Sequence, residues 1–292
     1  MIWDCGMGII TGKLYLLSEF YVMEGRFTTI QMNTERVTVG YTIHNKAYLI
    51  PHIVNGLKKC FSPDNEFIFL LDNCTDRSEK ELRERETGGY SFLIANTPEE
   101  YFEVRANNWI LENALSDVIV LFQDDMVCND IHLKGKINDI FEMYGDRTGL
   151  LGGRDGFELN STLFPERPVD KVSSWVHKPG QGRLLEDNEC CVRTFLNRGP
   201  LVFTKQLISE VGYLDESYYP QWGDDLDYCA DVKFKHGKKN IVFQCDIESR
   251  LDWGSTRRKD TSLFRMTRGK HIKRNWELFV SRWGKYINEN TI

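Results

Sequence analysis

The stretch Val118–Met126, with the sequence VIVLFQDDM, decides the fold. Its first five residues are apolar and mostly β-branched, which predicts a buried strand. This strand runs directly into two adjacent carboxylates, Asp124 and Asp125. In an open α/β sheet, ligands bind at the carboxyl ends of the strands, so both acids lie where a site is expected. They either hold Mg²⁺ or Mn²⁺ together with substrate phosphates, or form a turn that caps the next helix.

Strand and helix patterns alternate on both sides of this stretch. We expect strands at 37–43, 66–71, 90–94, 118–122 and 201–203, and helices at 47–60, 79–86, 98–115 and 205–211. In the first helix, Leu49, Ile53, Leu57 and Phe61 share one face. Repeated βα units predict an α/β fold with a doubly wound, mostly parallel, Rossmann-like sheet flanked by helices. Between 152 and 189, a Gly- and Pro-rich segment is typical of a functional lid or a disordered loop.

Composition excludes several classes of protein. The net charge of −6 over 292 residues argues against general nucleic-acid binding. No run approaches 18 apolar residues, and the start lacks the features of a signal peptide, so we expect a cytoplasmic protein. The eight cysteines include no C-x-x-C pair and the six histidines are scattered. This pattern predicts reduced thiols rather than disulfides or a zinc site.

The two ends of the chain differ from the central part. Residues 1–36 form an N-terminal extension, in which strands at 13–17 and 26–32 would be joined by a turn at Glu24–Gly25. Such a hairpin would pack on the main body or on a second subunit, which leaves an oligomer open. Residues 256–292 form a basic helical C-terminal tail, with ten Lys and Arg against two acids between 257 and 285. This amphipathic tail either docks on an anionic membrane surface, binds a phosphorylated acceptor, or packs on the core.

Short motifs follow one another in a fixed order between residues 37 and 285. They are VTVGYTIHN at 37–45, DNCTDRS at 72–78, RAN at 105–107, QDD at 123–125, GP at 199–200 with EVGYLDE at 210–216, GDDLD at 223–227 and FVSRWG at 279–284. Together they resemble the motifs of family 2 glycosyltransferases of the GT-A fold, in which QDD takes the place of the DXD-type metal motif. The resemblance divides residues 37–255 into a nucleotide-binding half (37–130) and an acceptor-binding half (131–255).

The resemblance also implies an activity. It points to inverting, metal-dependent transfer of a sugar from a nucleotide sugar, expected to be UDP-linked, to a hydroxyl of a glycan, lipid-linked or protein acceptor. Asp125 would hold Mn²⁺ or Mg²⁺, with Asp124 on the ribose or on a metal-bound water. Asp225, flanked by Asp224, would be the catalytic base. The residues expected to contact the nucleotide sugar are Thr42, His44, Asn45, Asp72, Asn107, Asp124, Trp222 and Arg257.

Several of these assignments have structural alternatives. Asp72 would accept a hydrogen bond from a uracil or thymine ring, or would cap the following helix. Trp222 would stack on a sugar face or belong to the core. The acids at 224–227 would be functional or would begin a charged helix, with Asp227 structural in either case. The stretch 251–258 departs from the family because it has no histidine to complete a metal site, although Arg257 would offer its charge to the diphosphate.

Two other functions remain open. A sugar-1-phosphate nucleotidyltransferase shares a related fold, but it would show a glycine- and basic-rich loop after the first strand, which residues 42–46 lack. A catalytically inactive GT-A-like module would bind a nucleotide sugar or a partner without transferring the sugar. Retention of both acid groups favours the enzyme. A peripheral contact with the inner face of a membrane through the basic tail is a further expectation.

Overall fold

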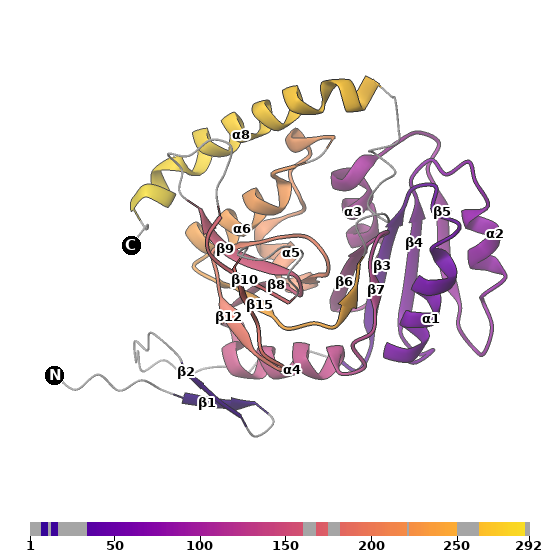
Figure 1. Ribbon diagram of the computed structural model, residues 1–292, viewed down its shortest axis with the longest axis horizontal. Helices are drawn as coiled ribbons and strands as arrows, with labels where there is room; N and C mark the ends of the chain where they lie inside the picture. The colour runs from indigo at the N-terminus through magenta and orange to yellow at the C-terminus, as the bar shows by residue number, and fades with distance from the viewer. Residues whose placement is uncertain are drawn as a thin grey trace.

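The computed structural model describes residues 7–10, 13–16, 34–159, 168–174, 182–220, 222–249 and 263–289. A mixed α/β domain is built on an eight-stranded sheet in the order β12-β15-β8-β14-β6-β3-β4-β5 (Figure 1). Its strands are β3 (Val37–Ile43), β4 (Glu66–Leu71), β5 (Phe92–Asn96), β6 (Val118–Gln123), β8 (Thr148–Gly152), β12 (Cys190–Val192), β14 (Leu201–Thr204) and β15 (Lys239–Phe243).

The sheet is mostly parallel. β6, β3, β4 and β5 are parallel neighbours, and β15 runs parallel to β8. β14 is antiparallel to both β6 and β8, and β12 is antiparallel to β15. The prediction of a mostly parallel sheet flanked by helices is confirmed, and β14 is the strand that reverses direction between its two halves.

Helices cover both faces of this sheet. They are α1 (Ile50–Cys60), α2 (Ser78–Arg83), α3 (Phe102–Asn113), α4 (Leu133–Tyr144), α5 (Lys205–Val211), α6 (Asp224–Phe234) and α8 (Leu263–Glu289), with short 3₁₀ helices η1 (Gly145–Arg147) and η2 (Glu216–Tyr218). The strand quoted first is buried on both faces, since Val118, Val120 and Phe122 join one core and Ile119 and Leu121 the other. The sequence predicted β3, β4, β5, β6, β14, α1, α2, α3 and α5, although α3 begins at Phe102 rather than at 98. It did not predict α4 or the strands β8, β12 and β15.

The segment expected to be an irregular lid contributes a second sheet. Its four strands have the order β11-β10-β9-β13, with β9 at Asp155–Leu159, β10 at Pro168–Ser173, β11 at Arg183–Leu184 and β13 at Phe195–Leu196. A two-stranded ladder pairs β7 (Val127–Cys128) with β16 (Ile247–Glu248). The described parts of 152–189 are therefore largely strand, which contradicts a disordered loop there, and a role as a lid stays a prediction.

The N-terminal extension contains a hairpin, as predicted, and the strand expected at 13–17 is present, but its partner precedes it in the chain. β1 (Met7–Ile10) pairs antiparallel with β2 (Lys13–Leu16). The expected second strand at 26–32 and its turn at Glu24–Gly25 lie outside the described residues.

The basic C-terminal segment is the long helix α8, drawn in yellow beside α6 in Figure 1. Trp276, Phe279, Trp283 and Ile287 are all at most 4% exposed and join the core that includes α6. Among the three readings of the tail, this packing favours a helix on the core with its charges in water. In the described part of the chain, none of the helices combines the length and apolar character needed to cross a bilayer.

Candidate active site

Residues predicted to bind a nucleotide meet at one edge of the sheet, because β3, β4 and β6 are parallel and end side by side. The backbone N–H of His44 donates to Asp124 Oδ2 at 3.2 Å, and His44 Nδ1 lies 2.6 Å from the carbonyl oxygen of Asp72. Beneath this edge, the Thr42 hydroxyl donates to Asn107 Oδ1 at 3.2 Å. The structure thus brings together predicted residues from three strands and from α3.

Asn45 joins the loops that follow β3 and β4. It adopts a left-handed φ of +49°, which asparagine tolerates better than most residues. Its Oδ1 accepts backbone hydrogen bonds from Thr75 at 2.8 Å and from Asp76 at 3.2 Å. Asn45 therefore fixes the shape of this edge, and its direct contact with a nucleotide stays a prediction.

Asp72 ends β4 with only 4% of its surface exposed. Its Oδ1 accepts the backbone N–H of Tyr101 at 2.5 Å, and its Oδ2 accepts that of Phe102 at 3.0 Å. These are the first amides of α3, so the carboxylate caps that helix rather than α2, the next helix in the chain. The geometry favours the capping alternative for Asp72.

Asp124 is neutralised by a residue that sequence reasoning did not assign to the site. Lys46 Nζ lies 2.9 Å from Asp124 Oδ1, and the lysine side chain is 3% exposed. Because His44 N–H occupies Oδ2, both oxygens of Asp124 have protein partners. A single lysine in a loop carries no sequence signature, so only the folded loop after β3 reveals it.

Asp125 differs from its neighbour. Its Oδ1 is buried without a hydrogen-bond partner. Burial, and secondly the charge of Asp124, raise the pKa of its carboxyl. A buried carboxylate oxygen without a donor suits a divalent cation, so the residues present fit Mn²⁺ or Mg²⁺. No three His, Cys, Asp or Glu side chains in the described ranges are grouped to hold a metal, so the remaining ligands would be diphosphate oxygens and water.

The second acid pair begins α6. Gly223 precedes it with a left-handed φ of +95°, a conformation that glycine adopts without strain. Asp224 is fully buried and Asp225 is 9% exposed. Burial raises the pKa of both carboxyls, that of Asp224 to about 7, even though Arg198 acts in the opposite direction. A carboxyl with a raised pKa is suited to accept a proton near neutral pH.

Arg198 and Glu103 link the two acid groups, and the sequence motifs missed both of them. Arg198 Nη1 lies 2.6 Å from Glu103 Oε2, and Nη2 pairs with Asp224 Oδ1. Glu103 Oε1 in turn accepts a hydrogen bond at 3.3 Å from Gln123, at the end of β6. The negative charge of Glu103 contributes to the raised pKa values of Asp125, Asp224 and Asp225 alike.

The backbone also holds these parts together. Gly199 follows Arg198 with a φ of +86°, and a Cβ on it would lie 2.2 Å from Met126 Sδ. A side chain there would meet the Met126 side chain, next to Asp125, and the left-handed φ also favours glycine. The two acid pairs, about a hundred residues apart in the sequence, are therefore linked in the fold through Gln123, Glu103 and Arg198.

Two predicted site residues remain, Trp222 and Arg257. Trp222 is half-buried, with its ring 6.0 Å from that of Trp276 on α8, so it packs on the core as one alternative proposed. Its stacking on a sugar stays a prediction. Arg257 lies outside the described residues.

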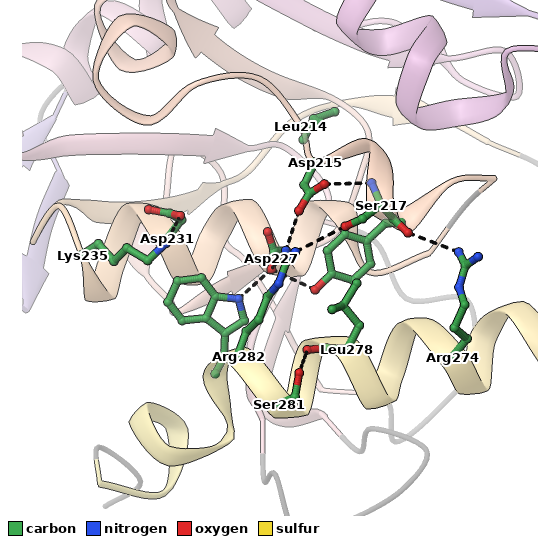
Figure 2. A network of polar contacts seen from close by, with 12 residues as sticks. Leu214, Asp215, Ser217, Asp227, Asp231, Lys235, Arg274, Leu278, Ser281 and Arg282 are labelled. Carbon is green, nitrogen blue, oxygen red and sulfur yellow. Dashed lines mark hydrogen bonds and ion pairs between the residues drawn. The ribbon is translucent and has the colours of Figure 1, made fainter.

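Asp227 is structural, as predicted. Its Oδ1 accepts hydrogen bonds from Tyr218 Oη at 2.8 Å, from Trp283 Nε1 at 2.7 Å and from Arg282 Nη1 at 3.2 Å. Figure 2 shows this carboxylate on α6 at the centre of contacts from α8 and η2. One buried acid therefore joins the helix that carries Asp224 and Asp225 to the C-terminal helix.

Solved structures resemble this architecture, although no protein-family model and no curated protein sequence matches the chain. The mannosyltransferase PcManGT from Pyrobaculum calidifontis, in complex with GDP-Man and Mn²⁺, superposes with a TM-score of 0.51 at 15% identity over 71% of this chain. GalNAc-T7, with UDP, GalNAc and Mn²⁺, gives a TM-score of 0.58 at 13% sequence identity over 75% of this chain. TarS from S. aureus gives a TM-score of 0.53 at 14% sequence identity over 85% of this chain.

This is the GT-A glycosyltransferase fold. The chain spans 56%, 44% and 43% of the lengths of these three proteins, about half or less. At such identities the likeness establishes the fold alone, and the chemistry of the GT-A domain has to be argued from its own residues.

Proposed function

We propose that this chain is an inverting, metal-dependent glycosyltransferase that moves a sugar from a nucleotide sugar, UDP-linked by the motif resemblance, to a hydroxyl of a glycan, lipid-linked or protein acceptor. The observation that carries the proposal is the convergence of two unlike acids. Asp125 keeps a buried oxygen without a hydrogen-bond partner at the end of β6, while Asp225 begins α6 with a raised pKa. Glu103 acts electrostatically on both of them.

Each acid has a distinct task. Asp125 would hold Mn²⁺ or Mg²⁺, which neutralises charge on the leaving diphosphate when bound. Asp225 would accept the proton of the acceptor hydroxyl as its oxygen attacks the anomeric carbon and the bond to the diphosphate breaks. The electron pair of that bond leaves with the nucleotide diphosphate, and the proton remains on the Asp225 carboxyl. His44, Thr42 and Asn45 would shape the nucleotide pocket at the strand ends.

A one-step displacement accounts for the inverting course. A double displacement would need a nucleophilic side chain beside the anomeric carbon. In the acid pair on α6, Asp224 is fully buried and bound to Arg198, so Asp225 is the member that retains exposed surface. One accessible base and one stabilised leaving group are the requirements of direct displacement.

Ligand-induced stabilisation tests donor binding. We would measure thermal unfolding with UDP, GDP, CDP and dTDP, each with Mn²⁺ and with EDTA, because a ligand of the native state raises the melting temperature. The proposal expects one nucleotide, UDP first, to stabilise the protein more with Mn²⁺ than with EDTA. No stabilisation by any of the four would contradict a nucleotide-sugar enzyme.

Turnover separates an enzyme from an inactive binding module. Release of the nucleotide from its sugar donors, with water or added glycans as acceptors, should fall about 10²–10⁴-fold in Asp225→Asn, which cannot take the proton. Nucleotide affinity should stay near the parental value. The matched control is Asp117→Asn, at an exposed position directly before β6. Binding without turnover in the parent would identify a binding module instead.

A further inference from the structure

Arg198 is a buried arginine shared by three carboxylates. Its side chain is 8% exposed. Nη1 lies 2.6 Å from Glu103 Oε2, Nη2 pairs with Asp224 Oδ1, and Nε lies 3.8 Å from Asp225 Oδ2. The three acids come from two helices, α3 and α6. One guanidinium therefore fixes how the start of α6 sits against α3.

The contacts of Arg198 with the two α6 acids are unequal. Asp224 is fully buried and makes the close contact, whereas Asp225 is 9% exposed and makes the long one. Asp225 Oδ1 also receives the backbone N–H of Leu226 at 3.0 Å. Asp224 thus anchors the arginine, and Asp225 is oriented without being enclosed by it.

The backbone next to Arg198 is held close to the end of β6, where the predicted metal ligand lies. Gly199 packs against Met126, and Gln123 at the end of β6 donates to the Glu103 carboxylate that Arg198 contacts. From this position the guanidinium extends to the start of α6. Through Glu103, the side chain therefore links Gln123 at the end of β6, two residues before Asp125, to the helix that begins with the predicted base.

We propose that Arg198 is a positioning residue for the base: anchored by Asp224 and Glu103, it directs the Asp225 carboxylate toward the acceptor. The inference rests on the proposed function, because it assigns Arg198 a task in the same site. Arginine suits the position because its planar, permanently charged group can face three carboxylates at once, which an ammonium group does less well.

The electrostatics give this role a distinctive signature. The charged groups that act on Asp225 are Arg198 and Glu103, with Asp224 beside it on the same helix. Arg198 lowers the pKa of Asp225 and Glu103 raises it, while burial sets the overall upward direction. Removing the arginine and removing the glutamate should therefore move the titration of the base in opposite directions, which a loss of packing alone would not do.

Four variants test the inference: Arg198→Met, Arg198→Lys, Glu103→Gln, and Arg183→Met as an exposed arginine in an ion pair away from the site. The measurements are the pH dependence of UDP release from UDP-glucose, UDP-galactose and UDP-N-acetylglucosamine, and UDP affinity with Mn²⁺ by calorimetry. Arg198→Met should lower kcat about tenfold or more and move the rising limb of the profile to higher pH. Glu103→Gln should move that limb to lower pH.

Arg198→Lys should recover part of the loss, and Arg183→Met should behave as the parent. UDP affinity should stay within about twofold of the parental value in all variants, because the arginine acts on the base and not on the binding of the donor. Shifts of the same sign in Arg198→Met and Glu103→Gln, or no shift in either, would overturn the inference. So would a loss of UDP affinity parallel to the loss of kcat.

A second measurement separates this inference from the proposed function. If the parent releases no UDP from the three donors, the UDP-linked proposal fails by itself. Carboxyl ¹³C NMR titration of Asp224 and Asp225 still decides the role of Arg198 without turnover. Opposite displacements in Arg198→Met and Glu103→Gln support it, and absent or parallel displacements overturn it. If Arg198→Met does not fold, Arg198→Lys and Glu103→Gln provide the comparison.

Discussion

The ammonium group of Lys46 lies 2.9 Å from Asp124 Oδ1, so the first acid of the QDD motif is neutralised within the protein. His44 N–H holds the other oxygen. The two acids that look equivalent in the sequence are therefore unlike in the structure: Asp124 is engaged, and Asp125 retains an oxygen without a hydrogen-bond partner. This difference favours Asp125 as the predicted cation ligand, while Asp124 holds the loop after β3 through Lys46 and His44.

Replacing Lys46 with Met should destabilise the fold by about 1–3 kcal/mol, because it leaves a largely buried carboxylate without its charged partner. Adding Asp124→Asn should restore part of the loss. Urea unfolding of the parent, both single variants and the double variant would give the coupling energy. Strictly additive effects would show that the pair contributes nothing as a pair.

Asp125→Ala should abolish the extra stabilisation that Mn²⁺ gives to nucleotide binding, while the protein without ligand unfolds near the parental temperature. A buried oxygen without a hydrogen-bond partner lowers the stability of the ligand-free protein, so the protein should tolerate its removal. Thermal unfolding with UDP, with and without Mn²⁺, is the measurement. Asp64→Ala, at an exposed position, serves as control. A variant stabilised by UDP and Mn²⁺ as fully as the parent would remove Asp125 from the metal site.

Asp224 should make stability depend on pH with a definite sign. Its folded-state pKa of about 7 lies above the ordinary value near 4, so the folded state binds the proton more tightly. The stabilisation is complete below about pH 4 and is lost as pH rises to about 7. Relative to the parent, Asp224→Asn should therefore gain stability over that interval. Denaturant unfolding from pH 4 to 8 checks this, and a constant difference across the range would refute it.

Asp227→Ala should loosen α8. It leaves the Trp283 indole N–H and the Tyr218 hydroxyl without their buried acceptor, at a cost of about 3 kcal/mol or more. Asp231→Ala is the matched control on the same helix, because it breaks a surface pair with Lys235 worth less than about 1 kcal/mol. Hydrogen exchange of the α8 amides, together with denaturant unfolding, would show the contrast. Equal effects of the two substitutions would contradict a structural role for Asp227.

The strands β3, β4, β6 and β14 could be predicted from the sequence because they are buried on both faces, whereas β8, β12 and β15 were not predicted. Leu49, Ile53, Leu57 and Phe61 also fixed the buried face of α1 correctly, since all four are at most 3% exposed. The start of α3 was predicted too early because the amides of Tyr101 and Phe102 are held by Asp72, an acid 29 residues away. A cap supplied from such a distance leaves no local pattern.

The site could be predicted only in part, for a similar reason. Acids that end a strand or begin a helix stand out in sequence, which is why Asp124, Asp125, Asp224 and Asp225 were recognised. Their partners were not, because Lys46 lies in a loop, Glu103 lies within a helix and Arg198 precedes a Gly-Pro pair. Ion pairs across the fold depend on tertiary proximity, and a single sequence without that proximity shows them only as ordinary charged residues.

The packing of α8 has a consequence for the order in which parts of the fold are completed during synthesis. Asn275 is fully buried, and its amide donates to the backbone carbonyls of Tyr218 and Trp222, which flank the turn into α6. During synthesis these carbonyls emerge from the ribosome more than fifty residues before their partner does. The contacts between the loops after β3, β4 and β6 join residues that have all been made by Asp124, whereas the turn before Asp224 gains its final support only when α8 arrives.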